Sequence, residues 1–249
     1  MISIDKTSIV ESESIGDGTI IEEFCVIRKN VILGKGVHIY PHVIIFEGSV
    51  IGDYTRLYPG TFVGKVPDGA GALARTPHYS NYISIGLNCA IGPNAVIYYN
   101  VKIGNNTLIG DGASIREQCS IGLFNIIGRY VTINYNTTIG NNVKVMDHTW
   151  LAGNMIVGNN VFISGGVLTS NDNAMGLNSY YEDFIQGPYI EENVKIGIGA
   201  KILPKVRMGK NSVIGAGSVV TKNVPEGAVV MGVPARIVRY MNKTNGESK

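Results

Sequence analysis

The sequence has few charged residues, only three cysteines and no long hydrophobic run. Charged residues make up 16% of the 249 positions, and the formal net charge is +2. So small a charge argues against nucleic acid or an anionic membrane as a partner, because both attract strongly basic proteins. No apolar run approaches the roughly 18 residues of a membrane-spanning helix, and the N-terminus shows no signal-peptide pattern. We therefore expect a cytoplasmic protein that needs neither membrane nor nucleic acid.

Glycine and β-branched residues are abundant instead. The chain has 32 glycines, and its apolar residues are rich in Ile and Val. β-Branched side chains suit pleated strands and glycine suits tight turns, so this composition favours a regular β architecture over helices.

Aliphatic residues recur at every sixth position in three series. The series run from Ile9 to Val63, from Ile85 to Ile163 and from Ile190 to Val220. If each such residue is called position i, a small or β-branched residue follows at i+4 almost every time. This hexapeptide pattern predicts an all-β, single-stranded left-handed parallel β-helix, in which three short strands form a triangular coil around the i and i+4 side chains. Such coils must stack to bury their apolar faces, and thirty hexads predict about ten of them.

Glycine marks one of the three faces of the predicted helix. It stands at i+1 once per coil, at positions 16, 34, 52, 86, 104, 122, 140, 158, 197 and 215. Because this phase continues past both interruptions of the repeat, we expect the interruptions to be loops inserted into one domain. The predicted single domain covers residues 1–249, with loops at about 64–84 and 164–189 and a short C-terminal cap at about 224–240.

The three cysteines, Cys25, Cys89 and Cys119, all fall at i+4, the small interior position. This predicts buried packing thiols rather than nucleophiles or metal ligands. Their spacing fits no zinc motif, and we expect no disulfide framework.

On two faces of the middle coils, polar and aromatic residues stand at the corners, where the third face carries glycine. Asn100, Gln118, Asn136 and Asn154 follow one another at 18-residue spacing, which predicts an outward polar column. Stacking of amides between coils is sufficient to explain such a column. With its Tyr and Arg neighbours, however, the column has the residue types that suit a polar sugar and its phosphates.

The two predicted loops lie beside these polar faces. Their attachment points are five coils apart, about 24 Å at the usual strand spacing, and long loops in compact folds are usually functional. The glycine-rich segment DGAGALAR, with Lys65 and Arg75, is able to hold phosphate; a flexible packing loop is the alternative. Together the faces and loops give these substrate-binding candidates: Arg116, Gln118, Asn134, Tyr135, Asn154, Asp172, Lys65 and Arg75.

The repeats and the ending SVVTKNVPEGAVVMGVPARIVR, residues 218–239, resemble the hexapeptide-repeat acyltransferase superfamily. The stretch FISGGVLTSNDN, residues 162–173, and the glycine-rich insertion before YISIG are similar to N-acetyltransferases that act on nucleotide-linked amino sugars. The best match within that branch is the group that acylates dTDP-amino-dideoxyhexoses.

The resemblance implies a homotrimer in which acetyl-CoA, the acyl donor, lies in the groove between two subunits and the active sites lie between subunits. It also implies that backbone amides of the late coils hold the pantetheine chain and that basic residues near the C-terminus meet the CoA phosphates. Carried onto this sequence, the cofactor-binding candidates are Gly166, Ala200, Ser218, Lys222 and Arg236.

His148 is the candidate general base. It stands at i+3, an outward position, and follows Asp147, which could orient it. An imidazole changes protonation near neutral pH and can accept the proton that a sugar amine loses as it attacks a thioester, and the Gly165–Gly166 turn offers N–H donors for the oxyanion. Some relatives lack a clear base, and there Asn136, with Gln118 and Asn154, would position the amine. His148 would then merely pack on Trp150 or on a neighbouring subunit.

Other functions stay open at this point. γ-Class carbonic anhydrases use the same helix, but their zinc needs three histidines per site, and the four histidines here are scattered; we expect no metal. A structural or ice-binding β-helix would show a flat Thr- or Ser-rich face without long loops. Within the enzymes, the alternative is O- or N-acetylation of another small acceptor, such as serine or a lipid precursor.

Overall fold

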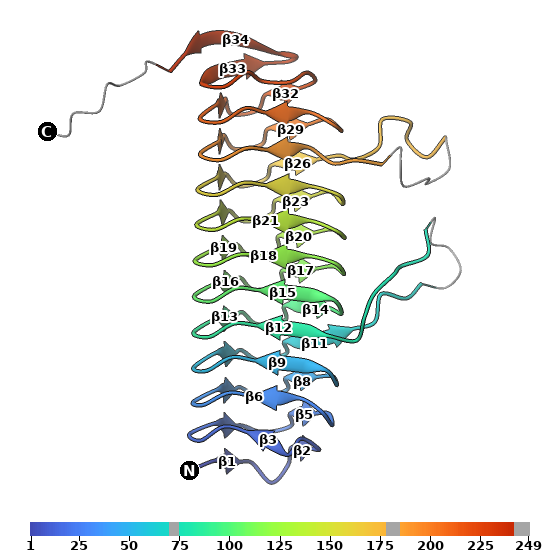
Figure 1. Cartoon of the computed structure of the whole chain (residues 1–249), viewed down its shortest axis with the longest axis vertical. Helices are drawn as coiled ribbons and strands as arrows, with labels where there is room; N and C mark the ends of the chain where they lie inside the picture. Colours follow the sequence, from blue (N-terminus) through green and yellow to red (C-terminus); the bar gives the residue numbers. More distant parts are fainter. Residues whose placement is uncertain (70–74, 178–184, 242–249) are drawn as a thin grey trace, which may run out of the picture.

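The computed structural model describes residues 1–69, 75–177 and 185–241. The chain forms a tall stack of triangular coils built from three sheets, whose strands run parallel except for an antiparallel pair at the C-terminal end (Figure 1). The predicted all-β, left-handed parallel β-helix is confirmed. The sheets hold 13, 11 and 10 strands, so the predicted count of about ten coils is slightly low. Four strands lie outside the thirty predicted hexads: one at Ser3–Ile4, one at Leu168–Thr169 before the second loop, and the pair Ala228–Gly232 and Ala235–Tyr240 that closes the C-terminus.

Sheet A contains β1 (Ser3–Ile4), β4 (Ile20–Ile21), β7 (His38–Ile39), β10 (Arg56–Leu57), β13 (Ala90–Ile91), β16 (Leu108–Ile109), β19 (Ile126–Ile127), β22 (Lys144–Val145), β25 (Phe162–Ile163), β28 (Lys195–Ile196), β31 (Val213–Ile214), β33 (Ala228–Gly232) and β34 (Ala235–Tyr240). Sheet B contains β2 (Ile9–Val10), β5 (Val26–Ile27), β8 (Ile44–Ile45), β11 (Phe62–Lys65), β14 (Val96–Tyr98), β17 (Ser114–Ile115), β20 (Thr132–Ile133), β23 (Trp150–Leu151), β26 (Leu168–Thr169), β29 (Lys201–Ile202) and β32 (Val219–Val220). Sheet C contains β3 (Ser14–Ile15), β6 (Ile32–Leu33), β9 (Ser49–Ile51), β12 (Ile83–Ile85), β15 (Val101–Ile103), β18 (Ser120–Ile121), β21 (Thr138–Ile139), β24 (Ile156–Val157), β27 (Tyr189–Ile190) and β30 (Arg207–Met208).

The chain visits the sheets in the order A, B, C, so each coil has an A–B corner, a B–C corner and a C–A corner. The i and i+4 side chains fill the interior as predicted: Ile127 and Val131, for example, are fully buried. The prediction that Ile9 is the first core residue is wrong. Val10, not Ile9, pairs with Ile27, and Ile9 is 54% exposed, because a shift of one residue turns a strand side chain to the opposite face.

Glycine at i+1 of the C–A corner is required by close packing. A Cβ on Gly16 would lie 2.4 Å from the backbone of the next coil, and one on Gly104 would lie 2.6 Å from it. The prediction that this glycine column continues past the second loop is wrong. Val157 pairs with Ile190, so Glu191 takes the expected place, whereas Gly197 follows a strand of sheet A and belongs to the A–B corner.

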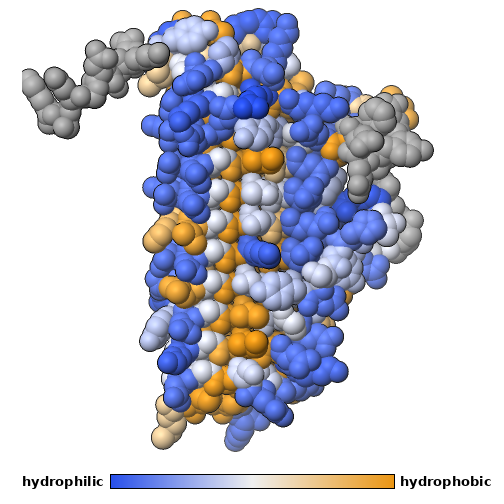
Figure 2. Space-filling view, viewed as in Figure 1, coloured by the Kyte–Doolittle hydropathy of each residue, from blue (hydrophilic) through white to orange (hydrophobic). Residues whose placement is uncertain are grey.

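Both inserted loops leave the helix at the B–C corner, on the right of Figure 1 and of the space-filling view in Figure 2. Loop one covers residues 66–82 and loop two covers residues 170–188, and the sheets pass beside both without interruption. Loop two therefore starts later than the predicted residue 164. Its preceding hexad was hidden because Thr169, a polar residue, occupies the i position, where its hydroxyl accepts the N–H of Ala152 at 2.7 Å.

The three cysteines are buried at i+4, as their spacing predicts. Each thiol donates to a backbone carbonyl 15 residues further on, as Cys119 does to Asn134 at 3.1 Å. Burial raises the pKa of the Cys119 thiol to about 12 and also raises the pKa values of Cys25 and Cys89. Within the described ranges, no helix is long and apolar enough to span a membrane.

Candidate functional site

The i+3 residue of nearly every corner has a left-handed backbone with φ near +60°. Asn and Gly tolerate this conformation best, so much of the asparagine column reflects backbone geometry. The ladder is real, since the Asn136 amide donates to Asn154 at 2.9 Å. The same ladder joins Asn88 to Asn106 at the C–A corner, at 2.8 Å. An amide ladder is therefore no signature of a site by itself.

The B–C corner between the two loops carries a denser cluster, centred on Glu117. This carboxylate is fully buried and accepts hydrogen bonds from Nε and Nη2 of Arg116 at 3.2 and 3.1 Å. It also forms an ion pair with Arg75 of loop one. One buried anion thus holds two guanidinium groups and fixes loop one to the helix.

Tyrosine rings flank these cations. The guanidinium carbon of Arg75 lies 3.6 Å from the ring centroid of Tyr135. Arg116 lies 5.7 Å from the rings of both Tyr98 and Tyr135, and the Lys65 ammonium lies 4.9 Å from the ring of Tyr98. Cations within about 6 Å of a ring face are attracted by its quadrupole, so the rings restrict where the charges lie.

Loop two contacts the same tyrosine. Asn171 donates to the Tyr135 hydroxyl at 3.2 Å and to the carbonyl of Gly153 at 3.3 Å. Gly153 lies under the ring, where an added Cβ would come within 2.6 Å of Tyr135. Both loops therefore meet at Tyr135. We call Lys65, Arg75, Tyr98, Arg116, Glu117, Tyr135 and Asn171 the loop cradle.

The remaining substrate-binding candidates take different positions. Asn154 lies at the edge of the cradle and donates to the Ile185 carbonyl of loop two at 2.7 Å, and Gln118 is exposed. Asn134 donates to the carbonyl of Leu151 at 2.8 Å. The carboxylate of Asp172 accepts two N–H groups of its own loop, both at 2.7 Å. Residues 70–74 of the predicted phosphate segment DGAGALAR lie outside the described residues.

Sequence reasoning missed the central part that Glu117, Gly153 and Asn171 play. The sequence does show Glu117 as an acid beside Arg116 in an otherwise neutral column. Its burial and its bond to Arg75, 42 residues away, depend on how loop one folds back. No periodic pattern carries that information.

His148 lies at the A–B corner, exposed and outward as predicted. Its ring stacks on Tyr130 of the preceding coil, with centroids 5.4 Å apart and an interplanar angle of 9°. The idea that Asp147 orients His148 is wrong, because the Asp147 carboxylate binds Arg129 at 2.6 and 2.9 Å. Hydrogen bonds from Arg129 also lower the pKa of Asp147.

A second histidine provides an internal comparison. His42 occupies the same i+3 position of an earlier A–B corner, with φ of 62° against 59° for His148. It stacks on Phe24 with centroids 5.2 Å apart and an interplanar angle of 11°. Stacking and backbone strain are therefore shared by the two histidines, and only their surroundings differ.

Beyond His148, the same A–B corner continues as open glycine backbone. Gly166, Gly199 and Gly217 occupy i+3 in the next three A–B corners, and a Cβ on any of them would meet no atom within 4 Å. Packing within the chain thus does not require these glycines to lack side chains. We call these three residues the glycine strip.

Three of the five cofactor-binding candidates, Gly166, Ala200 and Ser218, lie on or next to this strip. The Gly166 N–H donates to the Asp147 carbonyl at 3.0 Å. The side chains of Ala200 and Ser218 are buried. Lys222 is exposed at a late B–C corner and Arg236 is exposed on β34. His148 and Asn136 stand on different corners, with sheet B between them, so one chain does not bring the two catalytic candidates together.

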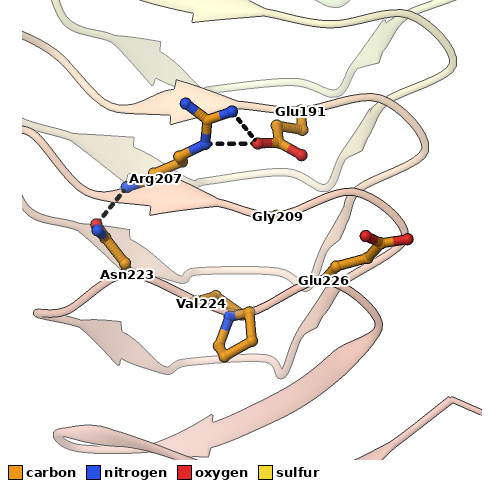
Figure 3. A pocket seen from close by; sticks show the side chains of 7 residues that line it. Glu191, Arg207, Gly209, Asn223, Val224 and Glu226 are labelled. Atoms are coloured by element: carbon orange, nitrogen blue, oxygen red, sulfur yellow. Dashed lines mark hydrogen bonds and ion pairs between the residues drawn. The ribbon is translucent and has the colours of Figure 1, made fainter.

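A surface cavity of about 330 Å³ lies elsewhere, near the C-terminal end (Figure 3). The cation that lines it, Arg207, is already paired with Glu191 at 2.5 Å. A further acid, Glu226, lines it, so acids outnumber cations there. In the described part of the chain, no three His, Cys, Asp or Glu side chains gather as a metal site would need.

The repeats match a known family. Residues 14–47, 82–117 and 187–222 match the family described as bacterial transferase hexapeptide (six repeats). The chain is similar to this family over these segments, which together make up less than half of its length. The structure is similar to that of UDP-N-acetylglucosamine acyltransferase from Campylobacter jejuni, with a TM-score of 0.50 and 19% identity over 96% of this chain and 75% of that one. At this identity the likeness shows the fold alone.

Two relatives illustrate the range of matches. The chain is 27% identical to the bifunctional protein GlmU of Koribacter versatilis (strain Ellin345), over 98% of this chain and 43% of the relative. It is 54% identical to the galactoside O-acetyltransferase of Lactococcus lactis subsp. lactis (strain IL1403), over 23% of this chain and 28% of the relative. The chain thus spans less than half the length of these relatives.

Proposed function

We propose that the protein transfers an acyl group, in the first instance acetyl, from acyl-CoA to the amine of a nucleotide-linked amino-deoxy sugar, with a dTDP-linked sugar as the preferred acceptor class. The observation that carries this proposal is the pair of outward sites on one helix. One is the glycine strip beside His148, and the other is the loop cradle between the two inserted loops. An acyltransferase needs both, because it must hold a long donor and a polar acceptor at once.

The glycine strip suits the donor. Its backbone is open where a neighbouring turn would carry Asn or Tyr, so an extended pantetheine chain can lie against it. Gly166, Ala200 and Ser218 line or adjoin this path, and Lys222 and Arg236 are the basic residues placed toward the CoA phosphates. The relative named as a galactoside O-acetyltransferase supports acetyl as the transferred group, for which acetyl-CoA is the proposed donor.

The loop cradle suits the acceptor. It combines guanidinium groups, tyrosine rings and amides, which recognise hydroxyl and phosphate oxygens. The solved acyltransferase that shares the fold is named for a UDP-linked sugar.

The two sites flank sheet B of the same chain and face different directions. We therefore propose that the active enzyme is a homotrimer in which the A–B corner of one copy faces the B–C corner of the next. Exposed Trp150 and Leu168 on sheet B supply apolar area for such a contact. His148 of one copy then accepts the proton of an amine held near Asn136 of the other.

The direct test is acceptor-dependent thiol release. Purified protein is incubated with acetyl-CoA and a panel of nucleotide-linked amino sugars, free amino sugars and serine, and the product is examined by mass spectrometry. We expect thiol release with a nucleotide-linked amine. The product should be heavier than the acceptor by about 42 Da, the mass of an acetyl group less that of the hydrogen it replaces. Release only with serine or a free sugar would contradict the acceptor class, and no release with any acceptor would contradict the function.

A further inference from the structure

The loop cradle has more cations than its own acid can neutralise. Within the described residues it contains Lys65, Arg75 and Arg116 but only one carboxylate, Glu117. The two other described carboxylates of the loops are occupied: Asp68 accepts the Gly69 N–H and Asp172 accepts two N–H groups of loop two.

The two arginines are held in place but are not saturated. A guanidinium group has five N–H donors. Among the described residues, Arg116 donates two N–H groups to Glu117 and Arg75 donates one. Their side chains are 25% and 17% exposed, so each keeps an edge open to solvent while Glu117 and the Tyr135 ring restrain the rest.

Such restraint is unnecessary for packing alone and useful for recognition. A partly buried cation without a full counter-charge is costly unless an anion completes the pairing. A guanidinium held in advance loses little side-chain freedom when it binds the planar edge of a phosphate. The cavity of Figure 3 shows the opposite arrangement, since Arg207 there is paired with Glu191 and acids predominate.

We propose that the loop cradle is a phosphate subsite that takes the diphosphate of a phosphate ester ligand on the open edges of Arg75 and Arg116. Glu117 acts as a positioning residue, because it touches the arginines and not the ligand. This inference deepens the function proposed above and rests on it for the source of the phosphate. That source is either the nucleotide diphosphate of the acceptor or the diphosphate of CoA.

Calorimetric titration with inorganic pyrophosphate tests the site without any acyl transfer. Four proteins are compared: the natural chain, Arg75→Gln, Arg116→Gln and the matched control Arg207→Gln, which loses an arginine that also pairs with a glutamate and lies 4.7 Å from the Tyr189 ring. We expect each cradle variant to bind about 10- to 100-fold more weakly, the usual loss for one charged hydrogen bond. The control should bind like the natural chain. Equal affinity in all four proteins would overturn the proposal.

Two additions keep the test decisive. Arg75→Lys, on loop one and outside the coils, retains the charge but not the guanidinium edge. It should bind pyrophosphate more weakly than the natural chain and more tightly than Arg75→Gln. Any other ranking of these three proteins would overturn the proposal, even if Arg116→Gln fails to fold. Competition by dTDP or by CoA then assigns the phosphate to the acceptor or the donor. Arginine-dependent binding without thiol release toward any amino sugar would leave the subsite standing and sink the proposed function. Thiol release with arginine-independent binding would do the reverse.

Discussion

The guanidinium carbon of Arg75 lies 3.6 Å from the ring centroid of Tyr135, although the two residues belong to a loop and a coil 60 positions apart. The hydroxyl of the same tyrosine accepts a hydrogen bond from Asn171 of loop two. One side chain thus contacts both loops, and the loops are expected to respond together when it changes.

Tyr135 variants should separate the two contacts. Tyr135→Phe keeps the ring under Arg75 and loses only the bond to Asn171, so loop two alone should exchange its amide hydrogens faster. Tyr135→Ala loses both contacts, and both loops should exchange faster. Hydrogen exchange followed by mass spectrometry on residues 75–82 and 170–177 measures this. Unchanged exchange of loop one in Tyr135→Ala would contradict the stacking role.

Glu117 should be far more important for stability than a surface glutamate. Glu117→Gln removes the buried partner of two arginines and should lower the free energy of unfolding by about 3 kcal/mol. Glu11→Gln breaks the exposed pair with Arg28, whose side chains are 42% and 43% exposed, and should cost no more than about 1 kcal/mol. Parallel thermal and urea unfolding of both variants checks the difference. Equal losses would contradict the burial of Glu117 as a source of stability.

The glycine strip should be sensitive in kinetics rather than in folding. Gly166→Ala and Gly199→Ala place a methyl group in open space, and their left-handed backbone costs about 1 to 2 kcal/mol. Each should raise KM for acetyl-CoA by about 10-fold or more. Gly18→Ala, with the same backbone and only ordinary contacts, is the control and should leave KM unchanged. A KM that rises equally in all three variants would argue against donor binding along the strip.

The three thiols should be inert in the native protein. Burial raises the pKa of each, to about 12 for Cys119, so little thiolate exists at pH 8 and access is blocked as well. Titration with a chromogenic disulfide reagent should count no fast thiol before denaturation and three after it. A fast-reacting native cysteine would contradict the assigned i+4 positions.

The fold could be predicted from the sequence because every hexad repeats one physical requirement. Where Thr169 replaced an aliphatic residue, and where Val10 rather than Ile9 faced inward, the pattern alone gave the wrong boundary. His148 and Tyr135 could be placed on their faces by counting residues. The contacts of Arg75 and Asn171 could not, since aperiodic loops fold back by interactions that no repeat encodes. The expectation that Asp147 orients His148 failed for a similar reason. Arg129 lies 18 residues from Asp147 in sequence but beside it in the preceding coil, and it binds the Asp147 carboxylate.

Shared active sites predict complementation between variants. His148→Asn and Arg75→Gln should each be weakly active, because each damages one half of every site. Copies of the two co-expressed with different affinity tags, and purified through both, should regain activity clearly above either parent, since some interfaces then combine two intact halves. Doubly tagged natural protein is the control for the tags. Activity no higher than that of the parents would place the whole site within one copy.

The most direct measurement is the turnover of acetyl-CoA with a nucleotide-linked amino sugar by His148→Asn and His42→Asn, side by side with the natural chain. Asparagine tolerates the left-handed backbone at both positions, and both variants lose one stacked imidazole. We expect His42→Asn to retain its kcat and His148→Asn to lose about 100-fold or more, as befits removal of a general base. An equal effect of the two substitutions would contradict the assignment of His148 as the base and leave it a stacking residue like His42.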